Sequence, residues 1–569
     1  MKYILNWSNP VKIFAIIFII IAAIFVAYRD ALDNGFLTMW DTHMYVLYNP
    51  HIKALTWENI QWMFTSFYMV NWHPLTWLSH AIDYAWFGLE PWGHHLVNII
   101  IHALNSILLF TLVIMLLSYQ GVAKSLAPIT DKTLLTAGIV AILFGIHPQH
   151  VESVVWIAER KDVLCLFFML LTFIAYIFYN TAKQTTKLRW YIVTLLCFIL
   201  ALLAKPMAVT LPVILLLMDV YPLHRTRLTV APNSVSYSRL ILEKIPFFVL
   251  TLISAILTIL AQHSDGAIAN LEGVSIQIRF LNVFNSLIFY ISKLIFPIGL
   301  SPLYPLPSYR HLSDFSSYLP SLIPIMACVF ITFICGYLWH KKQYYWLIAW
   351  LFYLVTLSPV IGIIQVGSQA AADRYAYLPT IPFYIFISFG IVKLLYDQHV
   401  KQYFKLVIVT SLLLVSILFI HLTQQQSHIW KNDLTFWGYI AAFAPNNILA
   451  HGNLGDVYMK MGEYEKAVGR YQHTLYLNPP HAMKNGTGGR LAEGYVKLGQ
   501  LQEGLEILNY LIDNNITKQY KVHKLYSLRG EIYFKQGLLE LAKQSLQKAL
   551  KLSPTNQQAA KLLAEINAQ

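Results

Sequence analysis

The chain has 569 residues, of which 57% are hydrophobic and 12% are charged, and its mean hydropathy is +0.52. A charged fraction so far below the one quarter of ordinary globular domains excludes that class and indicates a polytopic membrane protein. The formal net charge of +13 does not indicate a nucleic-acid-binding face, because Lys and Arg concentrate in short loops and in the C-terminal quarter of the chain, as topology signals and contacts with anionic lipids do.

The first apolar run, Val11–Ala27, follows Lys2 and has no small-residue cleavage site after it. It therefore predicts a retained first span with its N-terminus in the cytoplasm. The long segment that follows, residues 29–93, is then external. Segments of this length early in a membrane protein are usually functional, so we expect a catalytic loop here.

Further apolar runs have about the 20-residue length that a bilayer requires, and the whole chain is predicted to have about eleven spans. The segment 279–300 is long enough to span, but polar residues interrupt it. If this segment lies along the membrane surface or re-enters the membrane, both His340–Lys342 and the stretch 398–405 are in the cytoplasm. The odd number of spans then places the C-terminal domain outside. The further spans are expected at His94–Leu117, Thr133–Gly145, Leu164–Tyr179, Trp190–Leu203, Met207–Val220, Ile245–Ala261, Leu322–Trp339, Tyr345–Val360, Ile381–Leu395 and Leu406–Leu422.

Asp41 is the most conspicuous residue of the external loop, a lone carboxylate between Trp40 and Thr42. A positioned carboxylate that takes a proton from an acceptor hydroxyl speeds group transfer by about 10²–10⁴-fold. Asp-Thr is also ordinary turn chemistry, so the alternative is an exposed Asp that caps a local turn. We expect Asp41 to be a catalytic base at the membrane surface.

Polar residues in the loop and the second span surround this acid. His95, Asn98 and His102 share one helical face, which should point into the bundle; we expect interhelical hydrogen bonds that hold the first loop, or a direct supporting role. His73 and the Trp residues of the loop are expected mostly in an interfacial aromatic belt, where one or two could stack on a ligand.

The second external loop, His147–Lys161, contains a His-x-x-His pair near Glu152 that could be drawn as a metal site. Pro148 breaks a regular helical presentation of these ligands, and no closed set of outer partners is evident. The four cysteines lie in apolar runs and form no zinc motif. We therefore predict no metal site. Glu159 and Arg160 lie at the end of this loop, and Asp162 follows it. Arg160 and Asp162 belong to a site, stabilise the loop of Asp41 or form a solvated helix start.

Two cations interrupt apolar surroundings later in the chain. Lys205 lies in the run Leu202–Val209, where a buried cation costs about 2.5–3.5 kcal/mol on insertion scales and therefore suggests a partner. Arg374 stands beside Asp373 in the segment ADRYAYLP, so it forms either a structural ion pair or part of an anion site.

The C-terminal part of the chain is a repeat array. Residues of a 34-residue helix-turn-helix pattern recur three times, which predicts a short superhelix with a concave face for a protein or peptide. Packing or dimerisation is the alternative use. The three copies are marked by Leu454, Gly455, Tyr458, Ala467, Tyr471 and Pro479; by Leu491, Ala492, Tyr495, Gly504, Leu508 and Leu511; and by Gly530, Tyr533, Ala542, Leu546, Ala549 and Pro554.

The whole chain resembles the bacterial relatives of the transmembrane and tetratricopeptide-repeat O-mannosyltransferases, which are membrane glycosyltransferases of the GT-C fold. The resemblance rests on the order of five segments and the repeats: WDTHMYV, HHLVNIIIHA, HPQHVESVVWIAERKDVL, LLAKPMAVT and VGSQAAADRYAYLP. Family members commonly carry an Asp-Asp pair in the first external loop. Here the first Asp matches Asp41, but Thr42 replaces the second, so the resemblance does not carry over a carboxylate pair or a metal bound by it.

The resemblance implies an all-α, GT-C-type membrane domain at residues 1–423, a linker at 424–446 and a repeat domain at 447–569. It also implies transfer of a sugar from a polyprenyl-phosphate carrier, with inversion, to an acceptor outside the bacterial cytoplasmic membrane. The expected acceptor is a protein Ser or Thr hydroxyl, and no other cofactor is expected. Lys205, Arg374 and Arg160 are then expected to bind the donor phosphate. The expected supporting residues are Asp162, His95, Asn98, His102, His73, Glu159, Asp373 and Tyr377.

Two competing functions stay open from the sequence. One is a non-catalytic membrane scaffold whose repeats assemble envelope proteins. The other is a glycan ligase or polymerase that acts on a lipid-linked saccharide. In each case the expected partners are the bilayer and a protein or lipid-linked glycan, and no nucleic acid.

Overall fold

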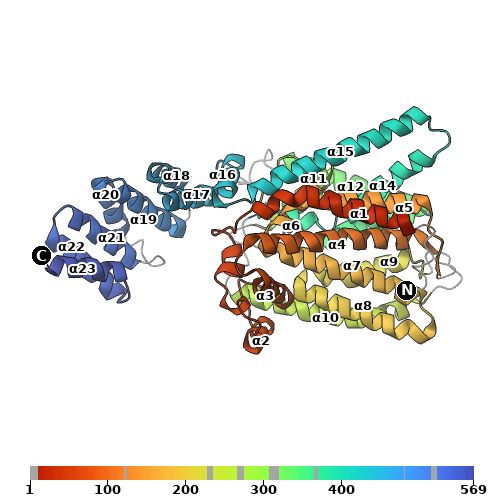
Figure 1. Cartoon of the computed structure of the whole chain (residues 1–569), viewed down its shortest axis with the longest axis horizontal. Helices are drawn as coiled ribbons and strands as arrows, with labels where there is room; N and C mark the ends of the chain where they lie inside the picture. Colours follow the sequence, from red (N-terminus) through yellow and green to blue (C-terminus); the bar gives the residue numbers. More distant parts are fainter. Residues whose placement is uncertain are drawn as a thin grey trace. The chain divides into compact units, whose positions relative to one another are not determined.

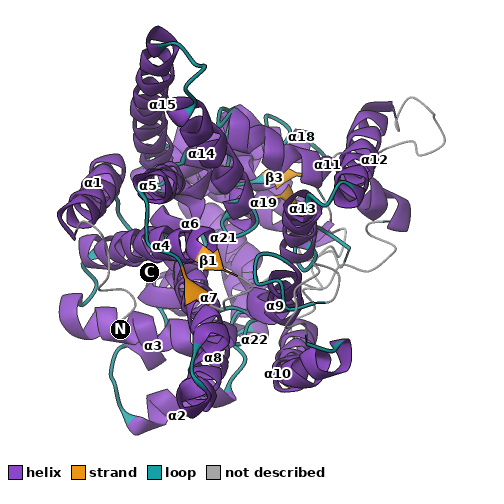
Figure 2. Cartoon of the chain, turned by 90° about the vertical axis from the view of Figure 1, so that its right-hand side faces the viewer, coloured by secondary structure: helices purple, strands orange, loops and turns teal. Residues whose placement is uncertain are grey.

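The computed structural model describes residues 10–568 except 121–124, 227–234, 265–274, 307–318, 364–368, 480 and 514–521. Lys2 and the first three residues of the segment VGSQAAADRYAYLP lie outside the described residues. The chain forms two compact units, Met1–Asn432 and Asp433–Gln569 (Figure 1). The described part is all-α, as predicted, apart from two short antiparallel strand pairs (Figure 2): β1 (Tyr119–Gln120) with β2 (Ser125–Leu126), and β3 (Tyr304–Pro305) with β4 (Gln369–Ala371).

The first unit is a bundle of apolar helices. Eight helices among the described residues are long and apolar enough to cross a membrane, or up to nine if α5 and the bent segment Pro148–Val155 count as one span. Apart from α11, the helices of the bundle coincide with the predicted spans. They are α1 (Pro10–Tyr28), α4 (Pro91–Ser118), α5 (Asp131–Gly145), α7 (Arg160–Thr181), α8 (Gln184–Ala204), α9 (Leu211–Val220), α10 (Tyr237–Ser264), α11 (Ile276–Ile295), α12 (Leu319–His340), α13 (Tyr344–Leu357), α14 (Ile381–Tyr396) and α15 (Gln402–Ile429).

Contacts between helix termini show which termini lie at each end of the bundle. At one end, Lys12 of α1 pairs with Asp131 at the start of α5, with 2.8 Å between Nζ and Oδ1. At the opposite end, here called the loop end, the amide of Asn34 donates to the carbonyl of Ser427 in α15 at 3.0 Å. The N-terminus of α1 and the C-terminus of α15 therefore lie at opposite ends of the first unit.

Helix α11 corresponds to the segment that was expected along the membrane surface. Its length and hydropathy alone would allow it to cross a membrane. Its hydrogen bonds, however, run to the loop end: Asn282 and Ser286 donate to the carbonyl of Ala370, and the carbonyl of Leu294 accepts from His147. The following Leu300 carbonyl accepts from Gln426, near the end of α15. These contacts keep α11 beside the loop end over most of its length and do not carry the chain to the opposite end.

The external segment 29–93 is largely structured. It contains α2 (Trp57–Thr65) and α3 (Pro74–Phe87), and the side chain of Thr56 caps α2 by accepting from the amide of Asn59. Its tryptophans divide into two groups, because Trp77 is buried whereas Trp57 and Trp86 are mostly exposed. Thr76 Oγ1 donates to the carbonyl of Ala204 at 2.9 Å, which fixes α3 beside the end of α8.

The second unit consists of three antiparallel helix pairs with one helix before and one after them. A Cβ added at Gly455 would lie 2.5 Å from the ring of Tyr471, and one at Gly530 would lie 2.7 Å from Leu546, so these small residues are what allows each pair to approach. The helices are α16 (Asp433–Phe443), α17 (Ile448–Met461), α18 (Tyr464–Tyr476), α19 (His481–Lys497), α20 (Leu501–Asp513), α21 (Val522–Lys535), α22 (Leu539–Leu552) and α23 (Gln557–Ala568).

The boundary between the units differs from the predicted linker at 424–446. Helix α15 continues to Ile429, and α16 belongs to the second unit, where it packs on α17. The physical reason is the apolar stripe of α16: Phe436, Trp437 and Ile440 are fully buried. A flexible linker would leave these side chains in water.

Candidate active site

Asp41 lies just before a short helical turn, His43–Leu47. Its main-chain carbonyl accepts from the amides of Met44 and Tyr45, whereas its half-buried carboxylate has no hydrogen bond or ion pair among the described residues. Burial raises the pKa of the Tyr45 hydroxyl, the charge of Lys161 opposes this rise and the charge of Asp41 adds to it. The carboxylate is therefore not used to cap the turn, and it lies within electrostatic range of Tyr45 and Lys161.

Glu159 is the centre of a buried charge cluster beside Asp41. Its Oε1 atom lies 3.0 Å from Nζ of Lys161 and 3.5 Å from Nε of Arg374, and its Oε2 atom lies 3.2 Å from Nζ of Lys205. All four side chains are at most about one-tenth exposed. A buried charge needs a partner, and here one carboxylate is shared by three cations.

Two further carboxylates complete the cluster. Glu152 receives the Nη1 group of Arg374 and, at 2.9 Å, its main-chain amide. Asp162 receives Nζ of Lys205 and, at 3.2 Å, the hydroxyl of Ser153. The cluster thus joins the second external loop, the end of α8 and the turn after β4, which are far apart in the sequence.

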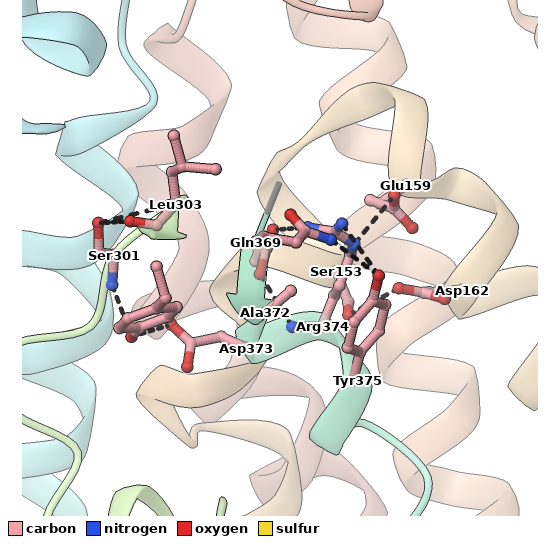
Figure 3. A network of polar contacts seen from close by, with 12 residues as sticks. Ser153, Glu159, Asp162, Ser301, Leu303, Gln369, Ala372, Asp373, Arg374 and Tyr375 are labelled. Atoms are coloured by element: carbon pink, nitrogen blue, oxygen red, sulfur yellow. Dashed lines mark hydrogen bonds and ion pairs between the residues drawn. The ribbon is translucent and has the colours of Figure 1, made fainter. Parts of the chain in front are cut away.

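Arg374 does not pair with its neighbour Asp373, the partner that the sequence suggested for a structural ion pair; its ion pairs are with Glu152 and Glu159 instead. Figure 3 shows the two side chains in separate groups of contacts. Asp373 Oδ2 accepts from the hydroxyl of Tyr304 at 2.9 Å. Burial, and after it the charge of Glu152, raises the pKa of Asp373 well above the usual range, although the Tyr304 hydroxyl opposes the rise.

Trp156 connects the loop to the cluster. Its indole N–H donates to Oγ1 of Thr42 at 3.2 Å. Its ring lies under two cations, with the centroid 5.5 Å from Nζ of Lys161 and 5.4 Å from the guanidinium carbon of Arg374. A small pocket lies beside it, lined by Gly35, Leu37, Thr42, His95, Val155, Trp156, Ile157 and Trp430.

Arg160 was expected to converge with Lys205 and Arg374, but the structure turns it away from them. Its Nη2 atom donates to Oδ2 of Asp83 at 2.6 Å and to the carbonyl of His94 at 2.9 Å, and its Nη1 atom donates to Ser79 at 2.7 Å. The side chain is fully buried, so it is not a solvated helix start either. It ties α7 to α3 and α4.

The polar face of α4 makes hydrogen bonds across helices. Asn98 donates to the carbonyl of Val154 at 2.9 Å and accepts from Arg160. His102 bonds the hydroxyl of Tyr377 at 2.6 Å and the carbonyl of Gly145 at 2.9 Å. These residues and Tyr377 support the helices around the cluster, whereas His95 lines the pocket beside Thr42.

His73 lies beside the charge cluster, whereas the His147–His150 pair does not. His73 is buried beside the cluster, and burial together with the charges of Lys161 and Lys205 lowers its pKa well below the usual value, so it is neutral. His147 and His150 instead each bond a main-chain carbonyl, of Leu294 and Phe144. These two do not gather around a common point with Glu152, which pairs with Arg374.

Sequence reasoning did not assign to this site two members of the charge cluster, Glu152 and Lys161, or the two aromatic residues beside it, Tyr45 and Trp156. The signal was present for Lys161, since a Lys at the start of an apolar helix needs an anionic partner. No comparable signal marked Trp156, because the chain has many tryptophans and only the fold shows which one lies between two cations.

Comparisons with known proteins bear on both units. Residues 449–481 and 523–556 match the tetratricopeptide-repeat family model. These two ranges correspond to the first and third predicted repeats. The protein O-mannosyl-transferase Tmtc1 of Drosophila melanogaster is 30% identical over 198 residues, covering 33% of this chain and 21% of that protein. The human protein O-mannosyl-transferase TMTC2 is 29% identical over 160 residues, covering 28% of this chain and 18% of that protein.

A longer match is found in Caenorhabditis elegans, where a protein O-mannosyl-transferase is 23% identical over 412 residues, covering 72% of this chain and 54% of that protein. The first two matches span only about a fifth of the length of those relatives. The sequence resemblance is confirmed by these matches. The solved structure of ArnT from Cupriavidus metallidurans bound to undecaprenyl phosphate aligns with a TM-score of 0.31 and 15% identity, covering 86% of this chain and 79% of that one.

Proposed function

We propose that this multi-pass membrane protein, a relative of the transmembrane and tetratricopeptide-repeat O-mannosyltransferases, transfers a sugar from a polyprenyl-phosphate carrier to a protein Ser or Thr hydroxyl outside the cytoplasmic membrane. The observation that carries the proposal is the carboxylate of Asp41, which has no hydrogen bond or ion pair within the described part of the chain and lies beside the buried cluster of Lys161, Lys205 and Arg374. A base for the acceptor and cations for a leaving phosphate are the two requirements of this chemistry.

Asp41 accepts the proton of the acceptor hydroxyl as the hydroxyl oxygen attacks the anomeric carbon of the sugar. The bond between the anomeric carbon and the phosphate oxygen breaks, and the electron pair leaves with the polyprenyl phosphate. Because attack and departure occur on opposite faces of the sugar, the anomeric configuration inverts. A positioned base of this kind contributes about 10²–10⁴-fold to the rate.

Lys205 and Arg374 bind the phosphate of the donor. Each Lys ammonium has three N–H groups and the Arg guanidinium has five, so their pairs with Glu152, Glu159 and Asp162 leave donors for a further anion. Lys161 belongs with them, because it contacts Glu159 and lies 5.1 Å from the centroid of the Tyr45 ring, next to Asp41. Arg160 is left out of the phosphate site, since Asp83, Ser79 and His94 already receive its N–H groups.

The carboxylates of Glu159 and Asp162 position the cations. A pair of lysines at membrane depth without these counter-charges would repel each other and lose protons. Thr42 fills the place of a second acid, and its hydroxyl fixes Trp156 instead of adding a charge. Asp41 therefore acts as a single base in this proposal.

The second unit recruits the protein acceptor. Tetratricopeptide arrays present concave surfaces that bind peptides or proteins. The last residues of the first unit lie at the loop end, beside Asn34, which supports repeats that begin on the same side of the membrane as Asp41. We place this side outside the bacterial cytoplasmic membrane, because the basic residues near the other end favour the cytoplasm.

Quantitative glycoproteomics of exported proteins, in cells with and without the chain, tests the proposal. We expect hexose on Ser or Thr residues of specific exported proteins to depend on the chain. If no protein changes while a lipid-linked or surface glycan does, the chain is a glycan ligase or polymerase. If neither changes while envelope complexes disassemble, it is a scaffold.

A further inference from the structure

A second buried cluster lies outside the proposed catalytic machinery, where α3 meets the start of α4. Its members are His80 and Asp83 of α3 and His94 of α4. One ligand-type atom from each lies within 4.8 Å of the others, and all three side chains are buried. Arg160 contacts this cluster from α7 through Oδ2 of Asp83.

The hydrogen bonding of His94 leaves two acceptor atoms of this cluster facing each other. Its Nε2 atom lies 3.0 Å from the carbonyl of Gly88, and a carbonyl only accepts, so Nε2 carries the proton. In the neutral ring, Nδ1 is then a bare lone pair. It faces Oδ2 of Asp83 at 3.5 Å, so two acceptors point at each other with no donor between them. A cation between them resolves the conflict.

His80 extends the same argument. It is fully buried, and neither of its ring nitrogens has a hydrogen-bond partner among the described residues. A buried polar atom without a partner costs about 1–3 kcal/mol, so such atoms call for a bound group. A second proton on His94, at Nδ1, would satisfy only the His94–Asp83 pair and would leave His80 without a partner. A metal ion would bind a ring nitrogen of His80 as well.

We propose that His80, Asp83 and His94 bind a zinc-class divalent metal ion that pins the first external loop to α4. Two imidazoles and one carboxylate are a usual zinc ligand set with one position left for water. Arg160 neutralises much of the charge of Asp83, so the ion is held mainly by nitrogen, which selects zinc-class ions over magnesium or calcium.

The surroundings have the features of a metal site's outer shell. Ligating histidines usually donate their other N–H to a carbonyl or carboxylate, as His94 does to Gly88, and ligating carboxylates are themselves hydrogen-bonded, as Asp83 is to Arg160. Zinc bonds are about 2.0–2.2 Å long, so two ligand atoms on one ion lie at most about 4.4 Å apart. The ligand atoms of the cluster lie within 4.8 Å of one another, and Nδ1 of His94 lies 3.5 Å from Oδ2 of Asp83, so binding requires only a small approach of the side chains.

The test measures metal in the purified full-length protein and does not depend on transferase activity. The protein is stripped with a chelator, reloaded with Zn²⁺ and dialysed, and zinc is counted per chain by plasma mass spectrometry. The expected wild-type result is one zinc per chain. Cobalt(II) added in place of zinc should give the intense visible bands of a four-coordinate site.

His80→Asn and Asp83→Asn should weaken zinc binding by at least about 10–100-fold, the range for losing even one outer-shell partner. His51→Asn, in the same loop but away from the cluster, is the matched control and should bind like the wild type. Reloaded wild type that retains no stoichiometric zinc and shows no cobalt bands overturns the proposal, whether or not the variants fold. Full binding by His80→Asn, or loss of binding in His51→Asn, overturns it as well.

Discussion

The Nζ atom of Lys205 lies 3.2 Å from Oε2 of Glu159, and the other oxygen of that carboxylate lies 3.0 Å from Nζ of Lys161. Lys205 comes from the end of α8 and Lys161 from the start of α7, so a single acid holds two cations from different helices in one place. This arrangement keeps both lysines charged in a buried position beside Asp41.

Glu159→Gln should destabilise the protein strongly. Removing one partner from a buried charge network leaves the others uncompensated, at a cost of about 3–5 kcal/mol. The midpoint of thermal unfolding in detergent is therefore expected to fall, with Glu58→Gln on the exposed face of α2 unchanged as the control. Equal midpoints for Glu159→Gln and wild type would contradict the role of Glu159 as the shared counter-charge.

Lys205→Met should weaken binding of the lipid-linked donor. Hydrogen bonds to charged groups contribute about 1.5–3 kcal/mol, so the KM for a polyprenyl-phosphate hexose is expected to rise by about 10–100-fold. Lys53→Met, at an exposed position of the same external surface, serves as the control. A variant that folds, transfers sugar and keeps the wild-type donor KM rules Lys205 out of the phosphate site.

Thr42→Val tests the link between the loop and the cluster. Valine keeps the shape of threonine but removes the oxygen that accepts from the indole N–H of Trp156, and the unpaired buried group costs about 1–3 kcal/mol. We expect a lower unfolding midpoint and slower transfer, because Asp41 is the adjacent residue. The exposed Thr65→Val should change neither, and a Thr42→Val protein that behaves like the wild type in both measurements would show that this hydrogen bond does not position Asp41.

Asp373 should make stability depend on pH. Its folded pKa is raised by burial and by the charge of Glu152, so its carboxyl group is neutral in the fold at pH values where it is ionised in the unfolded chain. Below the usual Asp pKa the carboxyl group is neutral in both states and does not change the free energy of unfolding. As pH rises from there towards the folded pKa, the group lowers the free energy of unfolding.

Unfolding midpoints from pH 4 upward, compared between wild type and Asp373→Asn, measure this effect. The advantage of the Asn variant should grow with pH, because Asn carries no charge to desolvate. The partly exposed Asp397→Asn, outside the site, is the control and should track the wild type. A difference between Asp373→Asn and wild type that stays constant across the pH range would show that the carboxyl group does not titrate as argued.

Much of the site could be foreseen because alternation of spans assigns residues to ends of the bundle. Asp41, Glu159, Lys205 and Arg374 were expected on one side of the membrane, and the structure brings the last three together at the loop end, beside the loop of Asp41. The repeats could also be predicted from the sequence, because Gly455 and Gly530 lie where two helices must approach each other. These inferences need only periodicity and composition, which the sequence contains.

The partner of each charge could not be foreseen in the same way. Glu159 directly precedes α7, and Arg160 and Lys161 are its first two residues; successive residues of a helix point about 100° apart. Arg160 therefore faces Asp83 and Asn98, while Glu159 faces Lys205 and Arg374. The neighbour that each of these side chains meets depends on helix packing, which is why the sequence alone did not separate Arg160 from Lys205.

The most direct test of the account is Asp41→Asn in cells that lack the native copy of the chain, with site-by-site quantification of hexose on exported proteins. Asparagine preserves the size of the side chain but cannot take the acceptor proton, so transfer should fall by about 10²–10⁴-fold at normal protein levels. Asp33→Asn, an exposed acid of the same external segment, should retain wild-type transfer. Hexose occupancy in the Asp41→Asn cells equal to that in wild-type cells would contradict the assignment of Asp41 as the catalytic base.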